Sequence, residues 1–152
     1  MYVYVRLIES TFANCQDQLL LILENYYEMT AKERSEKFEQ RLIDFAIRIV
    51  RLSNQLPKDF AGAYFGKQVL RSGSSPALNY AEARSAESDK DFRHKCSIAL
   101  KEMRETYVNL RIIEGAGLFE TERLASLIRE NHELIAILVS TVKTMDQKIK
   151  GG

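Results

Sequence analysis

The sequence predicts an all-α protein that folds as an antiparallel up-down-up-down four-helix bundle. Four segments carry apolar residues at alternating steps of four and three, which is the spacing of helices that pack nearly parallel. Only two prolines and seven glycines occur among 152 residues, so the chain has few helix breakers. The connections between the segments are short, and consecutive helices are therefore expected to be antiparallel neighbours.

The first, third and fourth helices follow from clear apolar series. We expect the first helix to stop at Pro57 and the third to begin after the capping candidate Ser88 and to end at Gly115. The expected core residues are Phe38, Leu42, Phe45, Ile49, Leu52 and Leu56 in the first helix; Phe92, Cys96, Ala99, Met103, Thr106, Leu110 and Ile113 in the third; and Leu124, Ile128, Asn131, Ile135, Leu138, Val142, Met145 and Ile149 in the fourth.

The second helix, expected over 60–88, is less regular and contains the stretch RSGSSPALNYAEA at 71–83. Pro76 cannot donate a backbone hydrogen bond, and its ring clashes with the carbonyl four residues earlier. The sequence therefore predicts a kinked second helix, with a bend or break near 72–75. Four small residues are expected to let this helix approach its neighbours closely: Gly62, Gly66, Gly73 and Ala77.

Polar residues surround Pro76 and have a structural interpretation. Ser72, Ser74 and Ser75 are candidates to bond the backbone groups freed at the kink, and Ser74 or Ser75 is a candidate to cap a helix that restarts at Pro76. Asn79 and Glu82 lie one helical turn apart, where we expect a polar contact inside the bundle.

Two helices carry apolar residues on a second side, which a lone four-helix bundle cannot bury. These residues are the candidate oligomer interface: Ile43, Ile47 and Val50 of the first helix, and Ile98, Tyr107, Val108 and Ile112 of the third. Exposed apolar patches of this size mark interfaces, so we expect homo-oligomers. Alternatively, residues 1–28 cover one stripe as a fifth helix, through Leu19, Leu20, Ile22, Leu23, Tyr26 and Tyr27.

The chain is divided by composition into an N-terminal extension, 1–28, and the bundle domain, 29–152. The extension is either an extra helix or a mis-assigned start. It has a net charge of −3, while residues 29–152 carry +4, which is far from the dense positive charge of strong nucleic-acid binders. Two isolated cysteines and the absence of a long apolar run favour the cytoplasm and no membrane span.

No motif for catalysis, phosphate cradling or metal binding occurs, so we expect no enzyme activity, no cofactor and no metal. His94 follows Asp91 by three residues, but a di-iron bundle needs a Glu-x-x-His on each of two helices. Cys96 falls on the core side of its helix without an adjacent base, so we interpret it as a packing residue. Glu82 is interpreted as a structural acid with a partner rather than as a catalytic carboxylate.

One charged feature suggests a function. The candidate nucleic-acid-binding residues lie on or near the outer side of the third helix: Lys90, Arg93, Lys95, Lys101, Arg104 and Arg111. Such a stripe suits contact with phosphates without sequence readout. Glu102 and Glu105 are interleaved, however, and mixtures of this kind also serve simply to solvate a helix face.

The central part of the chain resembles a known family. Residues 68–113 read QVLRSGSSPALNYAEARSAESDKDFRHKCSIALKEMRETYVNLRII. The stretch is similar to the signature of the bacterial four-helix bundle proteins related to the 23S rRNA intervening-sequence proteins. Its most specific parts are SPALNYAEA, AES, DFRHK and LKEMRET, and the resemblance covers about residues 34–149.

This resemblance implies a small cytoplasmic helical protein, often a ring-shaped homopentamer, without established catalytic activity. Members are encoded within intervening sequences of bacterial 23S rRNA genes or as free-standing genes. A related branch serves diversity-generating retroelements as an accessory protein that binds reverse transcriptase and nucleic acid, but that branch is strongly basic. Positions carried over as determinants of fold and assembly are Asn79, Glu82, Asp91, Phe92, Lys101, Glu102 and Glu105.

We therefore expect a non-enzymatic homo-oligomeric four-helix bundle that acts as an RNA- or nucleic-acid-associated scaffold, with no small-molecule substrate. The alternative is a protein-binding adaptor, including a retroelement accessory-like role, without direct contact to nucleic acid.

Overall fold

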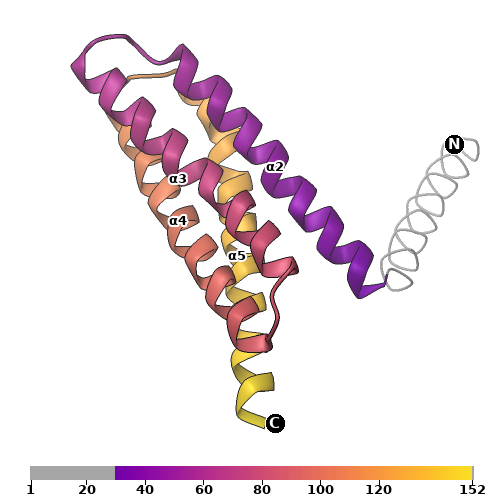
Figure 1. Cartoon of the computed structure of the whole chain (residues 1–152). Coiled ribbons are helices and arrows are strands. Elements are labelled where there is room, and N and C mark those ends of the chain that lie inside the picture. The colour runs from indigo at the N-terminus through magenta and orange to yellow at the C-terminus, as the bar shows by residue number, and fades with distance from the viewer. Residues whose placement is uncertain (1–29, 152) are drawn as a thin grey trace, which may run out of the picture. The chain divides into compact units, whose positions relative to one another are not determined.

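The computed structural model describes residues 30–151, which form four helices (Figure 1). Their bounds are Ala31–Gln55 for α2, Phe60–Arg84 for α3, Asp89–Gly115 for α4 and Thr121–Gly151 for α5. α4 packs against both α3 and α5, and side-chain contacts join α2 to α3 and to α5. The predicted all-α four-helix bundle is confirmed. The extension over 1–28, and with it the possible fifth helix, lies outside the described residues.

Local side-chain bonds explain where the helices begin. The Oγ1 of Thr30 accepts from the backbone N–H of Glu33 at 3.2 Å, and the Glu33 carboxylate accepts from the Thr30 N–H at 2.7 Å, a capping box at the start of α2. Asp59 accepts from the N–H of Gly62 at the start of α3. Ser88 accepts from the N–H of Asp91, so its predicted role as the cap of α4 is confirmed.

The core follows the predicted series closely in α2 and α4. All six expected residues of the first helix are buried, five of them within α2 and Leu56 directly after it. The α4 series is buried from Cys96 to Ile113, with Phe92 packed against its edge. In α5 the prediction is partly wrong, because Leu127 and Leu134 take the buried positions. Ile128 and Ile135 are only partly buried against the same core. Each leucine is followed by an isoleucine, so the apolar pattern alone left two adjacent registers open.

α3 approaches its surroundings closely where side chains are missing. A Cβ on Gly73 would lie 2.8 Å from Cγ1 of Ile49 on α2, which is closer than carbon atoms pack. A Cβ on Gly62 would lie 2.1 Å from the carbonyl oxygen of Pro57, in the connection before α3. At Gly66 the corresponding contacts, 3.5 Å or longer, are ordinary. Close approach of α3 to α2 therefore depends on Gly73, while Gly62 allows the tight entry into α3.

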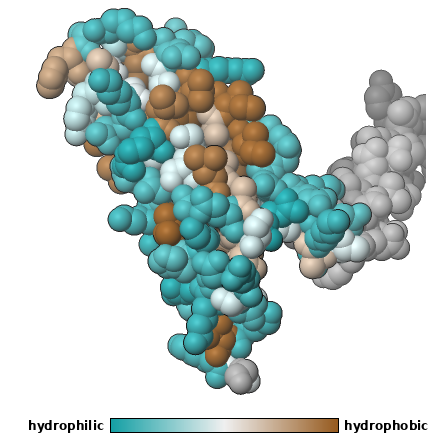
Figure 2. Space-filling view, in the orientation of Figure 1, coloured by the Kyte–Doolittle hydropathy of each residue, from teal (hydrophilic) through white to brown (hydrophobic). Residues whose placement is uncertain are grey.

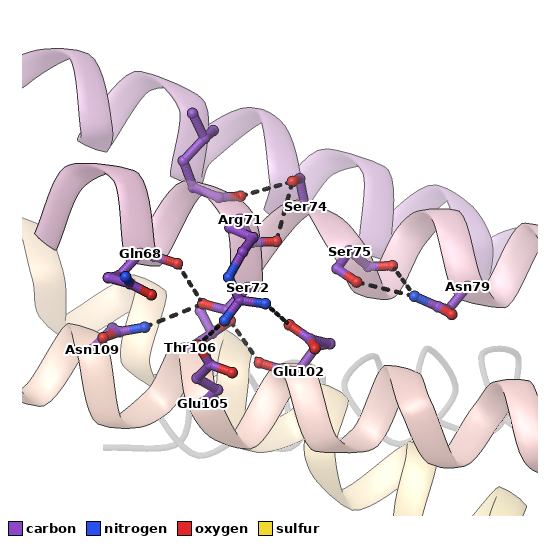
Figure 3. Close-up of polar contacts among 11 residues, drawn as sticks. Gln68, Arg71, Ser72, Ser74, Ser75, Asn79, Glu102, Glu105, Thr106 and Asn109 are labelled. Atoms are coloured by element: carbon purple, nitrogen blue, oxygen red, sulfur yellow. Dashed lines mark hydrogen bonds and ion pairs between the residues drawn. The ribbon is translucent and has the colours of Figure 1, made fainter. Parts of the chain in front are cut away.

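α3 does not break at Pro76, since it is helical throughout Phe60–Arg84. The expected restart of the helix, with Ser74 or Ser75 as its cap, is therefore wrong. Figure 3 shows what the serines do instead: the Ser74 hydroxyl donates to the carbonyl of Leu70 at 2.7 Å, and the Ser75 carbonyl accepts from Asn79 at 2.9 Å. Packing against α2 on one side and α4 on the other offsets the roughly 3 kcal/mol cost of an interior proline.

Polar groups between α3 and α4 are bonded across the helix interface (Figure 3). The buried Ser72 donates its hydroxyl to the carbonyl of Gln68 at 3.0 Å and accepts from Asn109 at 3.3 Å. The expected contact between Asn79 and Glu82 is wrong. Asn79 bonds to Ser75 within its own helix, while the Glu82 side chain is 58% exposed and pairs with a lysine of α4.

Asn131 is buried in the middle of α5 and leaves one polar atom without a partner. Its Nδ2 donates to the carbonyl of Met103 at 3.2 Å, whereas no residue of the described chain donates to its Oδ1. A buried polar atom without a hydrogen bond costs about 1–3 kcal/mol. We expect Asn131→Leu, which keeps the branching of the side chain and removes its polar atoms, to raise the free energy of unfolding by about 1–3 kcal/mol. Urea denaturation measures this, and a lower free energy of unfolding in the variant would contradict it.

Candidate interaction surfaces

The outer side of α2 carries three apolar residues of the predicted interface. Ile43, Ile47 and Val50 are 38%, 44% and 41% exposed. Exposed leucines of the adjacent helix α3 add to them, at positions 70 and 78. Figure 2 shows brown, hydrophobic side chains gathered between α2 and α3 on the face turned toward the viewer. We call this set the α2–α3 surface: Ile43, Ile47, Val50, Leu70 and Leu78.

The predicted interface residues of α4 do not all reach the surface. Val108 and Ile112, one turn apart, are 54% and 40% exposed. Tyr107 is half-buried, because its ring packs edge-on against His132 of α5 with ring centroids 4.5 Å apart. Ile98 is also half-buried. The outward apolar surface of α4 therefore centres on Val108 and Ile112, which we call the α4 surface.

The two surfaces lie at opposite corners of the bundle. α3 and α5 both pack against α4, and both also contact α2. α2 and α4 are therefore diagonal to one another, with α3 and α5 between them. Because each surface faces away from the shared core, the α2–α3 surface and the α4 surface point in different directions.

Three of the six predicted basic residues are engaged in ion pairs. Arg93 donates to Asp146 of α5 at 2.8 Å, and Lys95 lies 2.5 Å from the Glu82 carboxylate. The hydrogen bond with Arg93 lowers the pKa of Asp146. Arg111 donates to the Tyr107 hydroxyl at 3.0 Å and pairs with a glutamate one turn later.

The other three basic residues, Lys90, Lys101 and Arg104, are exposed and form no ion pair with residues 30–151. The six residues therefore do not form one continuous stripe of available charge. Lys101 and Arg104, one turn apart in the middle of α4, remain the part of the predicted nucleic-acid site best placed to contact phosphates.

Cys96 is fully buried, and burial raises the pKa of its thiol to about 11. The thiolate is the reactive form, so the group is largely protonated at neutral pH. We expect the Cys96 thiol of a Cys15→Ser variant to react with a thiol reagent at pH 8 only as fast as the protein unfolds. The rate with and without denaturant measures this, and rapid labelling of the native protein would contradict it.

His94 and Glu82, the other candidates for chemistry, are exposed and lie apart from any metal-binding group. Within residues 30–151, no three His, Cys, Asp or Glu side chains are placed to hold a metal ion. The same residues contain no helix with the length and apolar character to cross a bilayer.

One pocket was missed by the sequence analysis. It lies between α2 and α5, has a volume of about 310 Å³ and is lined by three arginines, Arg48, Arg51 and Arg123. Arg48 donates to the Ser126 hydroxyl at 2.8 Å, and Arg123 donates to the Gln55 side chain at 2.6 Å. Arg48, Arg51 and Gln55 are spaced so that they lie on one side of a helix, and this spacing could have indicated a polar cluster. Arg123 lies on α5 and reaches the cluster only in the folded chain, so its part in the pocket could not be predicted.

Comparison with known proteins places the chain in a family. The family model described as "23S rRNA-intervening sequence protein" matches residues 34–140, most of the described bundle. A crystal structure of a protein of unknown function from the S23 ribosomal protein family of Bacteroides thetaiotaomicron VPI-5482 is 35% identical, with a TM-score of 0.65. That match covers 70% of this chain and 98% of the other. No curated protein matches the chain. On the extent of these matches, the chain belongs to the 23S rRNA-intervening sequence protein family.

Proposed function

We propose that the protein is a non-enzymatic scaffold whose copies assemble through the α2–α3 surface. The observation that carries this proposal is the row of Ile43, Ile47 and Val50, each about two-fifths exposed on one side of α2. Contiguous apolar side chains of this kind are costly in water and mark association sites on soluble proteins. A second copy of the chain is the occupant that we propose.

Two different surfaces suit a ring. In a head-to-tail contact, one surface of each copy meets a different surface of the next, and repeated contacts close into a ring when the rotation permits. The α2–α3 surface and the α4 surface lie at diagonal corners and are both apolar. We propose that the α2–α3 surface of one copy packs against Val108 and Ile112 of the next, in agreement with the homopentamer that the resemblance implies.

The polar groups in the core support a structural role rather than a catalytic one. Ser72 and Thr106 donate their hydroxyls to carbonyls one turn earlier in their own helices. Asn131 links α5 to the backbone of α4, and Cys96 is buried with a raised pKa. The two hydroxyls and the Asn131 amide nitrogen are thus used in bonds to the backbone, and the Cys96 thiol is packed in the core.

RNA is the second partner that we propose, through the exposed basic residues of α4. The description of the family refers to 23S rRNA, and Lys101 and Arg104 are exposed without ion pairs among residues 30–151. Contacts of this type would bind the phosphate backbone without reading sequence. The adaptor without nucleic-acid contact remains the alternative.

A charge-reversal experiment tests the RNA contact. We expect the double variant Lys101→Glu, Arg104→Glu to bind structured RNA at least about tenfold more weakly than the wild type, and the slope of log K against log salt to become shallower by about 2. Fluorescence anisotropy over a salt series measures both. The matched control is Arg129→Glu, Lys143→Glu on α5, two exposed cations that should have little effect.

RNA affinity that is the same in wild type and double variant would contradict the proposed contact. Absence of RNA binding, together with a protein partner that is captured after nuclease treatment, would favour the adaptor.

A further inference from the structure

The lining of the pocket between α2 and α5 is basic and contains no acidic residue. Its lining contains three arginines and neither aspartate nor glutamate: Arg48, Arg51, Leu52, Gln55, Phe119, Arg123, Ser126 and Leu127. One of the three arginines has an acidic partner beside the pocket: Nη1 of Arg123 lies 3.7 Å from Oε2 of Glu120, one turn earlier. The positive charges of the pocket therefore outnumber this carboxylate by three to one.

Two other arginines that contact α5 are paired directly with carboxylates of that helix. Arg41 lies 2.9 Å from Glu130 of α5, and Arg93 lies 2.8 Å from Asp146. In the pocket, Arg48 instead donates to the neutral Ser126 hydroxyl, and Arg51 has no hydrogen bond or ion pair with the described part of the chain. Arg48 and Arg51, which have no carboxylate partner in the described part of the chain, therefore keep donors free for an anion.

The rest of the lining is apolar. Leu52 and Leu127 are buried core residues, and the ring of Phe119 lies beneath the Arg123 guanidinium, with 4.7 Å between Cζ and the ring centroid. The volume of about 310 Å³ is at the small end of ligand pockets, the size of a compact metabolite. The pocket thus combines charge for an anion with an apolar wall for a ring.

We propose that this pocket binds a nucleotide, with Arg48 and Arg51 contacting the phosphate and with the base or sugar packed against Leu52, Leu127 and Phe119. The guanidinium fork matches phosphate oxygens in pairs, which favours phosphate over a smaller halide. The nucleotide is either free or the phosphorylated end of an RNA strand, because both present the same chemistry. The site lies on the α5 side of α2 and is distinct from both assembly surfaces, so it goes beyond the scaffold role.

Calorimetry with UMP, AMP and inorganic phosphate tests this directly on the full chain. We expect a nucleotide to bind more tightly than inorganic phosphate, since only the nucleotide reaches the apolar wall. Arg51→Glu should weaken nucleotide binding at least about tenfold, because the change removes a charge-assisted hydrogen bond and places a carboxylate beside the phosphate. Arg51 is exposed, so the variant should fold, and circular dichroism checks this. Arg129→Glu, an exposed arginine of α5 outside the pocket, is the matched control.

A second arm compares 5′-phosphorylated with 5′-hydroxyl RNA oligonucleotides. Tighter binding of the phosphorylated strand than of both the 5′-hydroxyl strand and the free nucleotide, lost in Arg51→Glu, identifies the strand end as the ligand. Equal binding of nucleotide and phosphorylated strand identifies the free nucleotide. No binding of any nucleotide or strand at about 10 mM, or nucleotide binding unchanged by Arg51→Glu, would overturn the proposal.

Discussion

Ile47→Glu is expected to weaken self-association at least about 100-fold while leaving the bundle folded. Ile47 is 44% exposed within one copy, so a carboxylate there remains hydrated in the separate chain. In an apolar contact between copies the same carboxylate would lose water without gaining a partner, at a cost of several kcal/mol. Sedimentation velocity over a dilution series measures the change, and circular dichroism confirms that the helices persist.

The matched control for this substitution is Val139→Glu. Val139 is an exposed apolar residue of α5, 39% exposed, and lies outside both proposed surfaces. Its replacement should leave the mass unchanged. Equal dissociation by Val139→Glu and Ile47→Glu would show that the effect comes from added charge rather than from the α2–α3 surface.

Mixing variants tests the head-to-tail arrangement. Val108→Glu damages the α4 surface and spares the α2–α3 surface, while Ile47→Glu does the reverse. Each variant alone should be monomeric. A mixture should form heterodimers, because one intact contact remains between the two kinds of copy. If both copies instead used α2 in a symmetric contact, Val108→Glu would assemble like the wild type, and that result would contradict the ring.

Gly62→Ala is expected to destabilise the bundle by about 1–3 kcal/mol. The new Cβ would lie 2.1 Å from the carbonyl oxygen of Pro57, a backbone atom that cannot rotate away. Either the first turn of α3 or the preceding connection must therefore shift, and shifts of a packed backbone cost about 1–3 kcal/mol. Urea denaturation monitored by circular dichroism measures the loss.

Gly66→Ala, in the same helix, provides the control. Its Cβ would make ordinary contacts, 3.5 Å from the Ser53 carbonyl and 3.7 Å from Leu56. Because alanine favours a helix interior over glycine, we expect this variant to be as stable as the wild type or more stable, by up to about 1 kcal/mol. Equal stability of Gly62→Ala and Gly66→Ala would contradict the close contact at Pro57.

The helices and most of the core could be predicted from the sequence because their signals are local. Apolar residues that recur every three or four positions lie on one side of a helix, whatever the sequence of the rest of the chain. The register of α5 was harder, since both Leu127 and Ile128 fit the pattern. Leu127 is the buried one of the pair, and only packing against the other helices selects between them.

Features that depend on pairing between distant residues could not be predicted. Arg93 looked like an available cation from its place on α4, but the fold brings Asp146 within 2.8 Å of it. The basic pocket requires Arg123 to lie beside Arg48, and nothing in either local sequence specifies that meeting. The uninterrupted helix at Pro76 could not be predicted for the same reason. It depends on packing of α3 against α2 and α4, and the sequence of residues 71–83 does not specify that packing.

The mass of the wild-type protein in solution tests the central claim most directly. Multi-angle light scattering of the 17.5 kDa chain over a range of concentrations is the measurement. We expect a single species at several multiples of that mass, with Ile43, Ile47 and Val50 covered by a neighbouring copy. A particle of one chain's mass at every concentration would contradict the proposed assembly.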